Sequence, residues 1–109
     1  MKVVVLPKVR QYIYELSYIL YKKDYFSYLD TAEEYFEELF EDINTTLPNR
    51  QKRCAPEYFE RYGKNMFYAT FRKSKRTQWY VFFSIYEEND ELIYLVRYIT
   101  NNHVVAHFL

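Results

Sequence analysis

Residues 66–100 constrain the fold most, because they read as three consecutive β-strands. The expected strands, residues 66–72, 78–86 and 91–100, are rich in Tyr, Phe, Trp, Val and Ile, which suit a pleated, half-buried surface. Only short polar loops separate them. Loops of this length join antiparallel neighbours, whereas parallel neighbours need a crossover of roughly a dozen residues or more. The sequence therefore predicts an antiparallel meander.

The middle strand of this meander predicts a sheet with two unlike faces. Because side chains alternate along a strand, one face carries only apolar residues, Trp79, Val81, Phe83 and Ile85. The other face is aromatic and polar, with Gln78, Tyr80, Phe82, Ser84 and Tyr86. We expect helices to cover the apolar face and the second face to remain free.

The first half of the chain predicts two amphipathic helices after a short strand at residues 2–6. Pro7 suits a first helical turn, and apolar residues then recur at helical spacing to about Lys23: Val9, Tyr12, Ile13, Leu16, Ile19 and Leu20. The second helix is expected to be capped by Ser27 and to end at Pro48. Its apolar stripe is Leu29, Ala32, Phe36, Leu39, Phe40, Ile43 and Leu47. The short connection predicts an antiparallel hairpin on the apolar face of the sheet.

Two further helical segments complete the expected order. Residues 56–63 can form one or two turns between Pro56 and Gly63, and residues 103–109 can form a short last helix. A chain of 109 residues is sized for one domain. We therefore expect a single domain, residues 1–109, of the α+β class. It should be a two-layer structure with an antiparallel sheet packed by an N-terminal helical hairpin, in the order β-α-α-β-β-β-α.

Composition indicates the environment of the protein. The single cysteine, Cys54, excludes an internal disulfide and fits a reducing compartment. No stretch approaches the roughly 18 apolar residues of a membrane span, and no export signal is evident. We expect a soluble, cytoplasmic protein with no membrane partner. The 14 tyrosines suit half-buried faces and contact surfaces, because the ring is apolar and the hydroxyl is polar.

A neutral net charge conceals opposite charges in successive segments. Residues 24–42 hold eight acids and no bases, whereas residues 50–76 hold nine bases against Glu57 and Glu60. A charge of −8 is thus followed by one of +7. A local basic segment can attract phosphates although the whole chain is neutral. The acidic face of the second helix is expected to be solvated, or to orient the basic side toward nucleic acid by repulsion.

Two stretches of the sequence resemble one family of bacterial proteins. The run YFERYGKNMFYATFRKSKRTQWYVFFSIYEEN (residues 58–89) and the tail YLVRYITNNHVVAHFL (residues 94–109) are similar to a Bacteroides-type branch of the RelE/ParE toxins. The helical hairpin agrees with that family in length and pattern. The resemblance implies the toxin of a type II toxin–antitoxin system, which needs no cofactor and has a cognate antitoxin protein as its partner.

The resemblance implies two kinds of target. RelE-like members cut mRNA in the ribosomal A site with basic residues on the free sheet face and a Tyr, His or Glu near the C-terminus. ParE-like members poison DNA gyrase. We expect ribosome-dependent mRNA cleavage ahead of gyrase inhibition, with a non-enzymatic protein-interaction module of the same fold as the third alternative. The neutral charge and the absence of Lys or Arg from the middle strand depart from the RelE pattern and keep all three open.

Three residues near the end of the last expected strand are the catalytic candidates. Metal-free RNA cleavage needs a base, an acid and cations at the phosphorane. Arg97 would stabilise the phosphate from the free face, unless it pairs with Glu15 or Glu91 or is exposed at an edge. His103 would donate the proton with Tyr98 assisting, unless it simply faces solvent.

The loop after the first strand of the meander is the candidate nucleic-acid-binding segment. Its cations can hold phosphates while bases stack on neighbouring rings. The expected contacts are Arg72, Lys73, Lys75, Arg76, Trp79 and Tyr80. Arg50, Lys52 and Arg53 can extend this patch. The alternative is an ordinary solvated turn.

Three other features have simpler interpretations. His103 and His107 are spaced like zinc ligands, but no Cys, Asp or Glu follows in this tail to complete a site, so no metal is expected. Cys54 is expected to fill a half-buried position rather than to act as a nucleophile. One side of the first helix either packs in the core or contacts an antitoxin; it carries Tyr14, Tyr18, Tyr21 and Tyr25.

Overall fold

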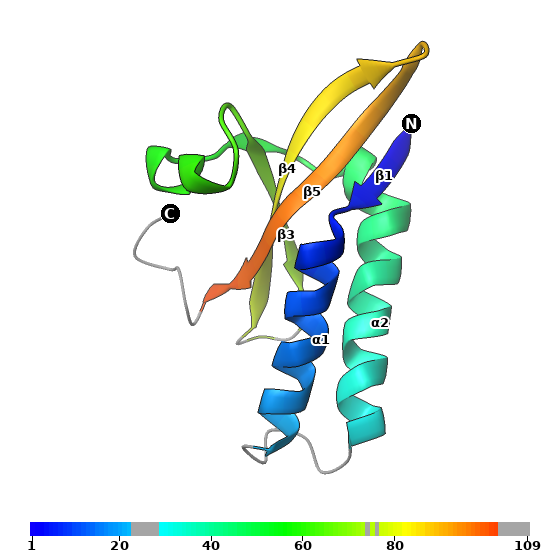
Figure 1. Cartoon of the computed structure of the whole chain (residues 1–109), viewed down its shortest axis with the longest axis vertical. Helices are drawn as coiled ribbons and strands as arrows, with labels where there is room; N and C mark the ends of the chain where they lie inside the picture. The colour runs from blue at the N-terminus through cyan, green and yellow to red at the C-terminus, as the bar shows by residue number, and fades with distance from the viewer. Residues whose placement is uncertain (23–28, 74, 76, 103–109) are drawn as a thin grey trace.

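The computed structural model describes residues 1–22, 29–73, 75 and 77–102. Within these residues the chain forms a five-stranded sheet with helices on both sides (Figure 1). The elements are β1 (Lys2–Val5), α1 (Pro7–Lys22), α2 (Leu29–Thr46), the 3-10 helix η1 (Leu47–Asn49), β2 (Arg53–Cys54), the 3-10 helix η2 (Glu57–Tyr62), β3 (Phe67–Arg72), β4 (Gln78–Glu88) and β5 (Glu91–Asn101). The expected α+β class is confirmed. The expected last helix, residues 103–109, and the Ser27 cap lie outside the described residues.

The sheet is mixed rather than wholly antiparallel, which corrects the prediction. Its strand order is β1-β5-β4-β3-β2. The meander β3-β4-β5 is antiparallel as predicted, but β1 runs parallel to β5, with Val3 opposite Tyr94 and Val5 opposite Val96. Most of the chain joins β1 to β5, so no short loop forces these two strands to be antiparallel. The two-residue β2 pairs with β3 in a segment that the sequence leaves irregular.

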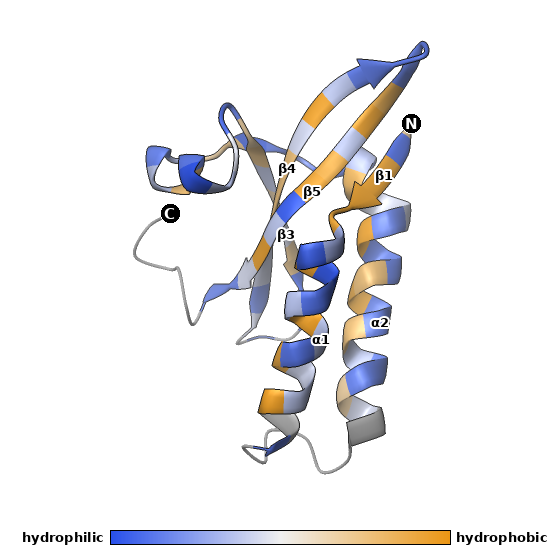
Figure 2. Ribbon diagram, viewed as in Figure 1, coloured by the Kyte–Doolittle hydropathy of each residue, from blue (hydrophilic) through white to orange (hydrophobic). Residues whose placement is uncertain are grey.

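The helical hairpin covers the apolar face of the sheet, as predicted. The stripe of α2 is buried throughout its described part, and it meets the alternating residues of β4 in one core. That core includes Phe36, Leu39, Phe40, Ile43, Leu47, Trp79, Val81 and Phe83. The Trp79 Nε1–H donates to the Tyr35 hydroxyl at 2.9 Å, which satisfies the only polar atom of the buried indole. The alternation of hydrophobic and hydrophilic bands along β4 and β5 is visible in Figure 2.

The stripe predicted for α1 is partly wrong. Val9 and Ile13 are buried as expected, but Tyr12 and Ile19 are 42% and 46% exposed, and Ser17 is buried instead. The Ser17 hydroxyl donates to the Tyr14 carbonyl at 2.7 Å, so this small polar side chain can be buried without an unmet hydrogen bond. The inward face of α1 is therefore narrower than the sequence predicts, and apolar side chains remain on its outer surface.

The second face of the sheet is not free along its whole length, contrary to expectation. η2 lies across it on the side away from α1 and α2 (Figure 1). The Phe59 ring stacks on Phe82 with centroids 4.2 Å apart, and both side chains are fully buried. Pro56 precedes η2 and Gly63 ends it, as the sequence predicts. The apolar Phe82 in the middle of the second face is what this 3-10 helix covers.

None of the helices in the described residues is both long enough and apolar enough to cross a membrane.

Replacing Phe36 with Ala should destabilise the domain strongly. Phe36 is fully buried between the helices and the sheet, with its ring edge-on to Trp79 at 5.6 Å. Removing a buried aromatic ring of this kind costs about 3–5 kcal/mol. Urea denaturation followed by tryptophan fluorescence measures the loss. Leu92→Ala, at a side chain that is 41% exposed, is the matched control and should change the unfolding free energy by less than about 1 kcal/mol.

Candidate functional site

A groove on the second face of the sheet, beside η2, is the candidate functional site. Its volume is ≈ 340 Å³. We call it the β3–β4 groove; its lining is Gln51, Arg53, Tyr68, Ala69, Thr70, Gln78 and Tyr80. Two of these residues are tyrosines, two are glutamines and one is an arginine, and none is acidic.

Strand alternation explains why the groove forms at this place. β3 presents Tyr68 and Thr70 to the second face, opposite Phe82 and Tyr80 of β4. The Tyr68 and Tyr80 rings lie 6.1 Å apart, and the short Thr70 side chain leaves space beside them. Gln78 Nε2 donates to the Tyr80 hydroxyl at 3.4 Å. The groove thus combines ring faces with amide and hydroxyl groups that can read a base.

One arginine, Arg53, lines the groove, and a second, Arg72, pairs with the lining residue Gln78. Arg53 is opposite Tyr68 in the β2–β3 pair and is exposed. Arg72 is opposite Gln78 in the β3–β4 pair and is also exposed. Guanidinium groups bind phosphate through paired N–H donors. The groove can therefore hold a phosphate at its rim and a base against its rings.

A β-bulge places Arg97 and Tyr98 together on the second face. Phe82 pairs with Tyr98, but the next residue, Phe83, pairs with Val96, so Arg97 is an extra residue in β5. A bulge re-aims the side chains around it. Val96 and Ile99 both reach the core, although regular alternation would put them on opposite faces. Two of the three catalytic candidates are thus neighbours on the same side of the sheet.

Arg97 is held by Ser84 and by the close approach of Gly63. Its Nε–H donates to the Ser84 hydroxyl at 2.9 Å. A Cβ atom on Gly63 would lie only 2.7 Å from Arg97 Cδ, so a larger residue at this position would displace the half-buried arginine stem. Arg97 forms no ion pair with Glu15, Glu91 or any other described residue. Its two terminal nitrogens form no hydrogen bond to a described residue, which leaves them available to an anion.

Tyr98 belongs to an aromatic stack under η2. Its ring stacks on Tyr62 with centroids 3.9 Å apart and an angle of 5° between the planes. Burial and the hydrogen bond with Tyr98 raise the pKa of Tyr62 to about 12. Tyr62 therefore stays protonated at neutral pH, and it can donate a proton in a hydrogen bond but cannot act as a base there.

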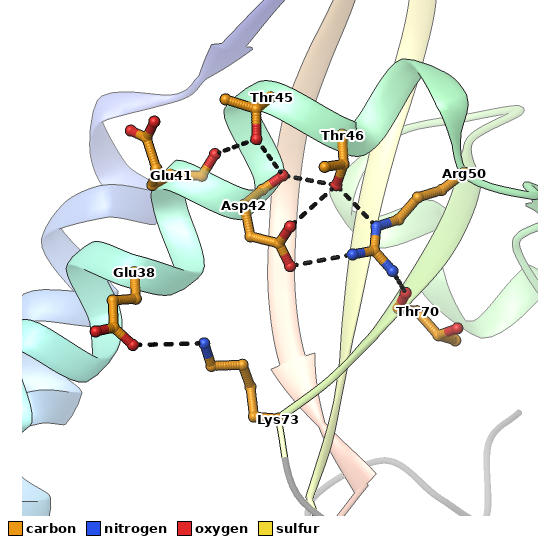
Figure 3. A network of polar contacts seen from close by, with 8 residues as sticks. All are labelled: Glu38, Glu41, Asp42, Thr45, Thr46, Arg50, Thr70 and Lys73. Carbon is orange, nitrogen blue, oxygen red and sulfur yellow. Dashed lines mark hydrogen bonds and ion pairs between the residues drawn. The ribbon is translucent and has the colours of Figure 1, made fainter.

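The structure places two expected nucleic-acid contacts on the helix side of the sheet, away from the groove. Trp79 is only 2% exposed and faces the helices, so its ring is closed to a base. Lys73 has a side chain that is 18% exposed; its Nζ lies 4.0 Å from Glu38 and 5.5 Å from the centre of the Tyr35 ring. Lys73 thus joins β3 to α2 (Figure 3). Lys75 is exposed in the loop, while Arg76, His103 and His107 lie outside the described residues.

Arg50 does not extend the basic patch; it anchors α2 to β3. Its guanidinium pairs with Asp42 at 3.0 Å and donates to the Thr46 hydroxyl at 2.9 Å and the Thr70 carbonyl at 3.0 Å (Figure 3). It also lies 3.8 Å above the centre of the Phe71 ring. With these partners Arg50 is a structural residue on the helix side of the sheet.

Five groove residues are absent from the candidates that the sequence predicts: Gln51, Tyr68, Ala69, Thr70 and Gln78. Gln78 and Tyr80 lie on the face that alternation predicts for them, and the same alternation applied to residues 66–72 points to Tyr68 and Thr70. Gln51 has no such signal, because it lies in an irregular segment. Among the described residues, no cluster of three His, Cys, Asp or Glu side chains could hold a metal ion.

No protein-family model matches this chain, and comparisons with curated proteins and with solved structures give no significant match.

Arg50→Ala should destabilise the domain, whereas Arg53→Ala should not. Arg50 makes three polar contacts that bridge two elements, and the loss of such charged hydrogen bonds costs about 1–3 kcal/mol. Arg53 is exposed at the groove and should change stability by less than about 0.5 kcal/mol. Thermal and urea unfolding of the two variants measure the difference. Equal stabilities would contradict the division of these neighbouring arginines into a structural and a surface residue.

Proposed function

We propose that the protein is the toxin of a type II toxin–antitoxin pair of the RelE/ParE kind and cleaves mRNA on the ribosome. The observation that carries this proposal is the β3–β4 groove, which joins two tyrosine rings to Arg53 and is lined by no acidic residue. The β-bulge supports it, because it directs Arg97 to the same face of the sheet. The order of strand, helical hairpin and antiparallel meander agrees with the resemblance in the sequence.

The size and chemistry of the groove suit one nucleotide of single-stranded RNA. A volume of ≈ 340 Å³ falls in the range of pockets for small ligands, roughly 300–1,000 Å³. Unpaired bases can stack on the faces of Tyr68 or Tyr80, and this stacking tolerates many sequences. Arg53 and Arg72 supply positive charge for the backbone.

In this proposal Arg97 stabilises the scissile phosphate. Ser84 occupies its Nε–H, so the terminal nitrogens approach the phosphate as the charge of the phosphorane develops. Tyr98 lies beside Arg97. When the 2′-hydroxyl attacks the phosphorus, its proton passes to solvent water, and His103 donates a proton to the leaving 5′-oxygen. Asn102 accepts a hydrogen bond from the Gln78 backbone N–H at 3.0 Å, which brings the chain just before His103 to the end of the groove.

A second candidate is the non-enzymatic interaction module, which one observation favours. The outer surface of α1 exposes Tyr12, Tyr14, Tyr18 and Ile19, and exposed aromatic residues are enriched in protein interfaces. The ParE-like alternative, inhibition of DNA gyrase, is separated from both by a supercoiling assay.

Single-stranded RNA binding should depend on the groove arginines. The double variant Arg53→Ala, Arg72→Ala should bind an unstructured RNA oligonucleotide more weakly in fluorescence anisotropy. The slope of log binding constant against log salt concentration should decrease in magnitude by roughly 0.7 for each phosphate that an arginine no longer neutralises. Lys8→Ala, an exposed lysine at the start of α1 on the opposite layer, is the matched control and should bind like the wild type. An unchanged affinity in the double variant would rule out the groove as the RNA site.

Cleavage should depend on Arg97. In a cell-free translation reaction, 5′ ends of mRNA mapped after addition of the wild type should reveal ribosome-dependent cuts. Arg97→Ala should cut about 100- to 1,000-fold more slowly, as expected for removal of a group that stabilises the transition state. Its unfolding temperature should stay close to that of the wild type.

Cleavage at the wild-type rate by Arg97→Ala would remove this residue from the site. Intact mRNA with the wild type, together with inhibited gyrase supercoiling, would replace the ribonuclease function with the gyrase function. Intact mRNA and active gyrase would leave the interaction module.

A further inference from the structure

The outer surface of α1 has the shape of one half of a helix pair. A shallow hollow of ≈ 460 Å³ is lined by Gln11, Tyr14, Glu15, Tyr18 and Ile19. Gln11, Tyr14, Glu15 and Tyr18 follow the spacing i, i+3, i+4, i+7. Four residues at this spacing form the hole that receives a side chain from a facing helix. The hollow therefore indicates that the partner of this surface is itself a helix.

The same surface also supplies a side chain that fits such a hole. Ile19 is 46% exposed at the edge of the hollow, beside Tyr18 at 50% and Tyr14 at 39%. Figure 2 shows hydrophobic bands among the hydrophilic ones along α1. A surface that contains both the hole and the matching apolar side chain is complementary to itself, which is the requirement for a two-fold symmetric interface.

Charges on α1 select the direction of the second helix. Glu15 lies at the hollow, and Lys22 is exposed two turns later on the same side of α1. Two parallel copies would bring Glu15 to Glu15 and Lys22 to Lys22, which repel. In an antiparallel pair, Ile19 of the second copy sits over the hollow of the first. Tyr18 of the second copy then lies opposite Glu15 of the first, and Lys22 of the second copy lies opposite Gln11 of the first.

In this antiparallel pair, the Lys22 side chain of one copy points toward Glu15 of the other copy. Helical side chains tilt toward the N-terminus of their own helix, and the Lys22 Nζ does so here, 5.6 Å from the centre of the Tyr18 ring. In the antiparallel pair this direction runs toward Glu15 of the facing copy. Glu15 accepts a hydrogen bond only from Gln11 Nε2 (3.1 Å) among the described residues, so its carboxylate is available to the lysine. The two-fold axis creates the same contact twice.

We propose that two copies of this chain associate through antiparallel α1 helices, with Ile19 of each copy seated in the hollow of the other. The occupant of the α1 surface is thus a second copy of the chain. The interface is formed by one helix from each copy, so it is small, and small interfaces give weak and reversible association. The groove on the second face of the sheet takes no part in it.

Sedimentation velocity of the full chain over a concentration series tests this proposal. The wild type should shift from monomer to dimer as the concentration rises from about 1 µM to several hundred µM, the affinity range expected for a small interface. Ile19→Glu should remain monomeric, or dimerise at least about ten-fold more weakly. Leu92→Glu, an apolar side chain of similar exposure on β5, is the matched control and should dimerise like the wild type.

Charge reversal tests the antiparallel arrangement. Glu15→Lys and Lys22→Glu should each weaken dimerisation several-fold, because each places like charges together at two symmetric contacts. The double variant Glu15→Lys, Lys22→Glu should restore it. Circular dichroism and thermal unfolding should show the same fold in all variants, since the substituted side chains are exposed. A wild type that is monomeric throughout, an Ile19→Glu variant that dimerises normally, or a double variant without recovery would each overturn the proposal.

Discussion

Burial of β4 on both faces is the constraint on which the rest of the structure depends. Val81 and Phe83 point into the core under α1 and α2, whereas Phe82 points the other way and is just as deeply buried. One helical layer cannot cover both sides of a strand, so a second cover is needed, and Phe59 of η2 provides it. η2 spans only six residues and covers the sheet around Phe82. Beside it, at Tyr80 and Thr70, the sheet stays open, and this is where the groove lies.

The β-bulge at Arg97 allows β5 to supply residues to the core and to the second face of the sheet. A regular β5 would present either Val96 or Ile99 to the helices but not both, because they are three residues apart. The extra residue lets both enter the core, and it leaves Arg97 and Tyr98 adjacent on the other side. Ser84 and Gly63 then fix the arginine, one by accepting its Nε–H and one by having no side chain. Packing in the core and presentation of a cation thus have one structural origin.

The periodicity of apolar residues predicts most of the helices and strands, but it does not predict which distant strands pair with one another. The described part of the α2 stripe is correct because every apolar residue in it packs into the core, while the acidic side of the helix stays exposed. α1 has only one buried side, and Tyr12 and Ile19, at the margin of its stripe, are exposed. Trp79 lies away from the groove, because its alternation with Val81 places it under the helices. The parallel pairing of β1 leaves no mark in the sequence, because it joins segments separated by most of the chain.

Charge is divided between the two sides of the sheet more finely than the sequence indicates. The basic segment, residues 50–76, follows an acidic helix. Two acids of that helix pair with two of these bases, Asp42 with Arg50 and Glu38 with Lys73. Lys52 lies over the Phe67 ring, whose side chain belongs to the helix-side core. The arginines that remain at the second face, Arg53, Arg72 and Arg97, form no ion pair with a described residue. A chain of zero net charge can thereby present a cationic face, since many of its acids lie on α2 and these guanidinium groups lie on the opposite side of the sheet.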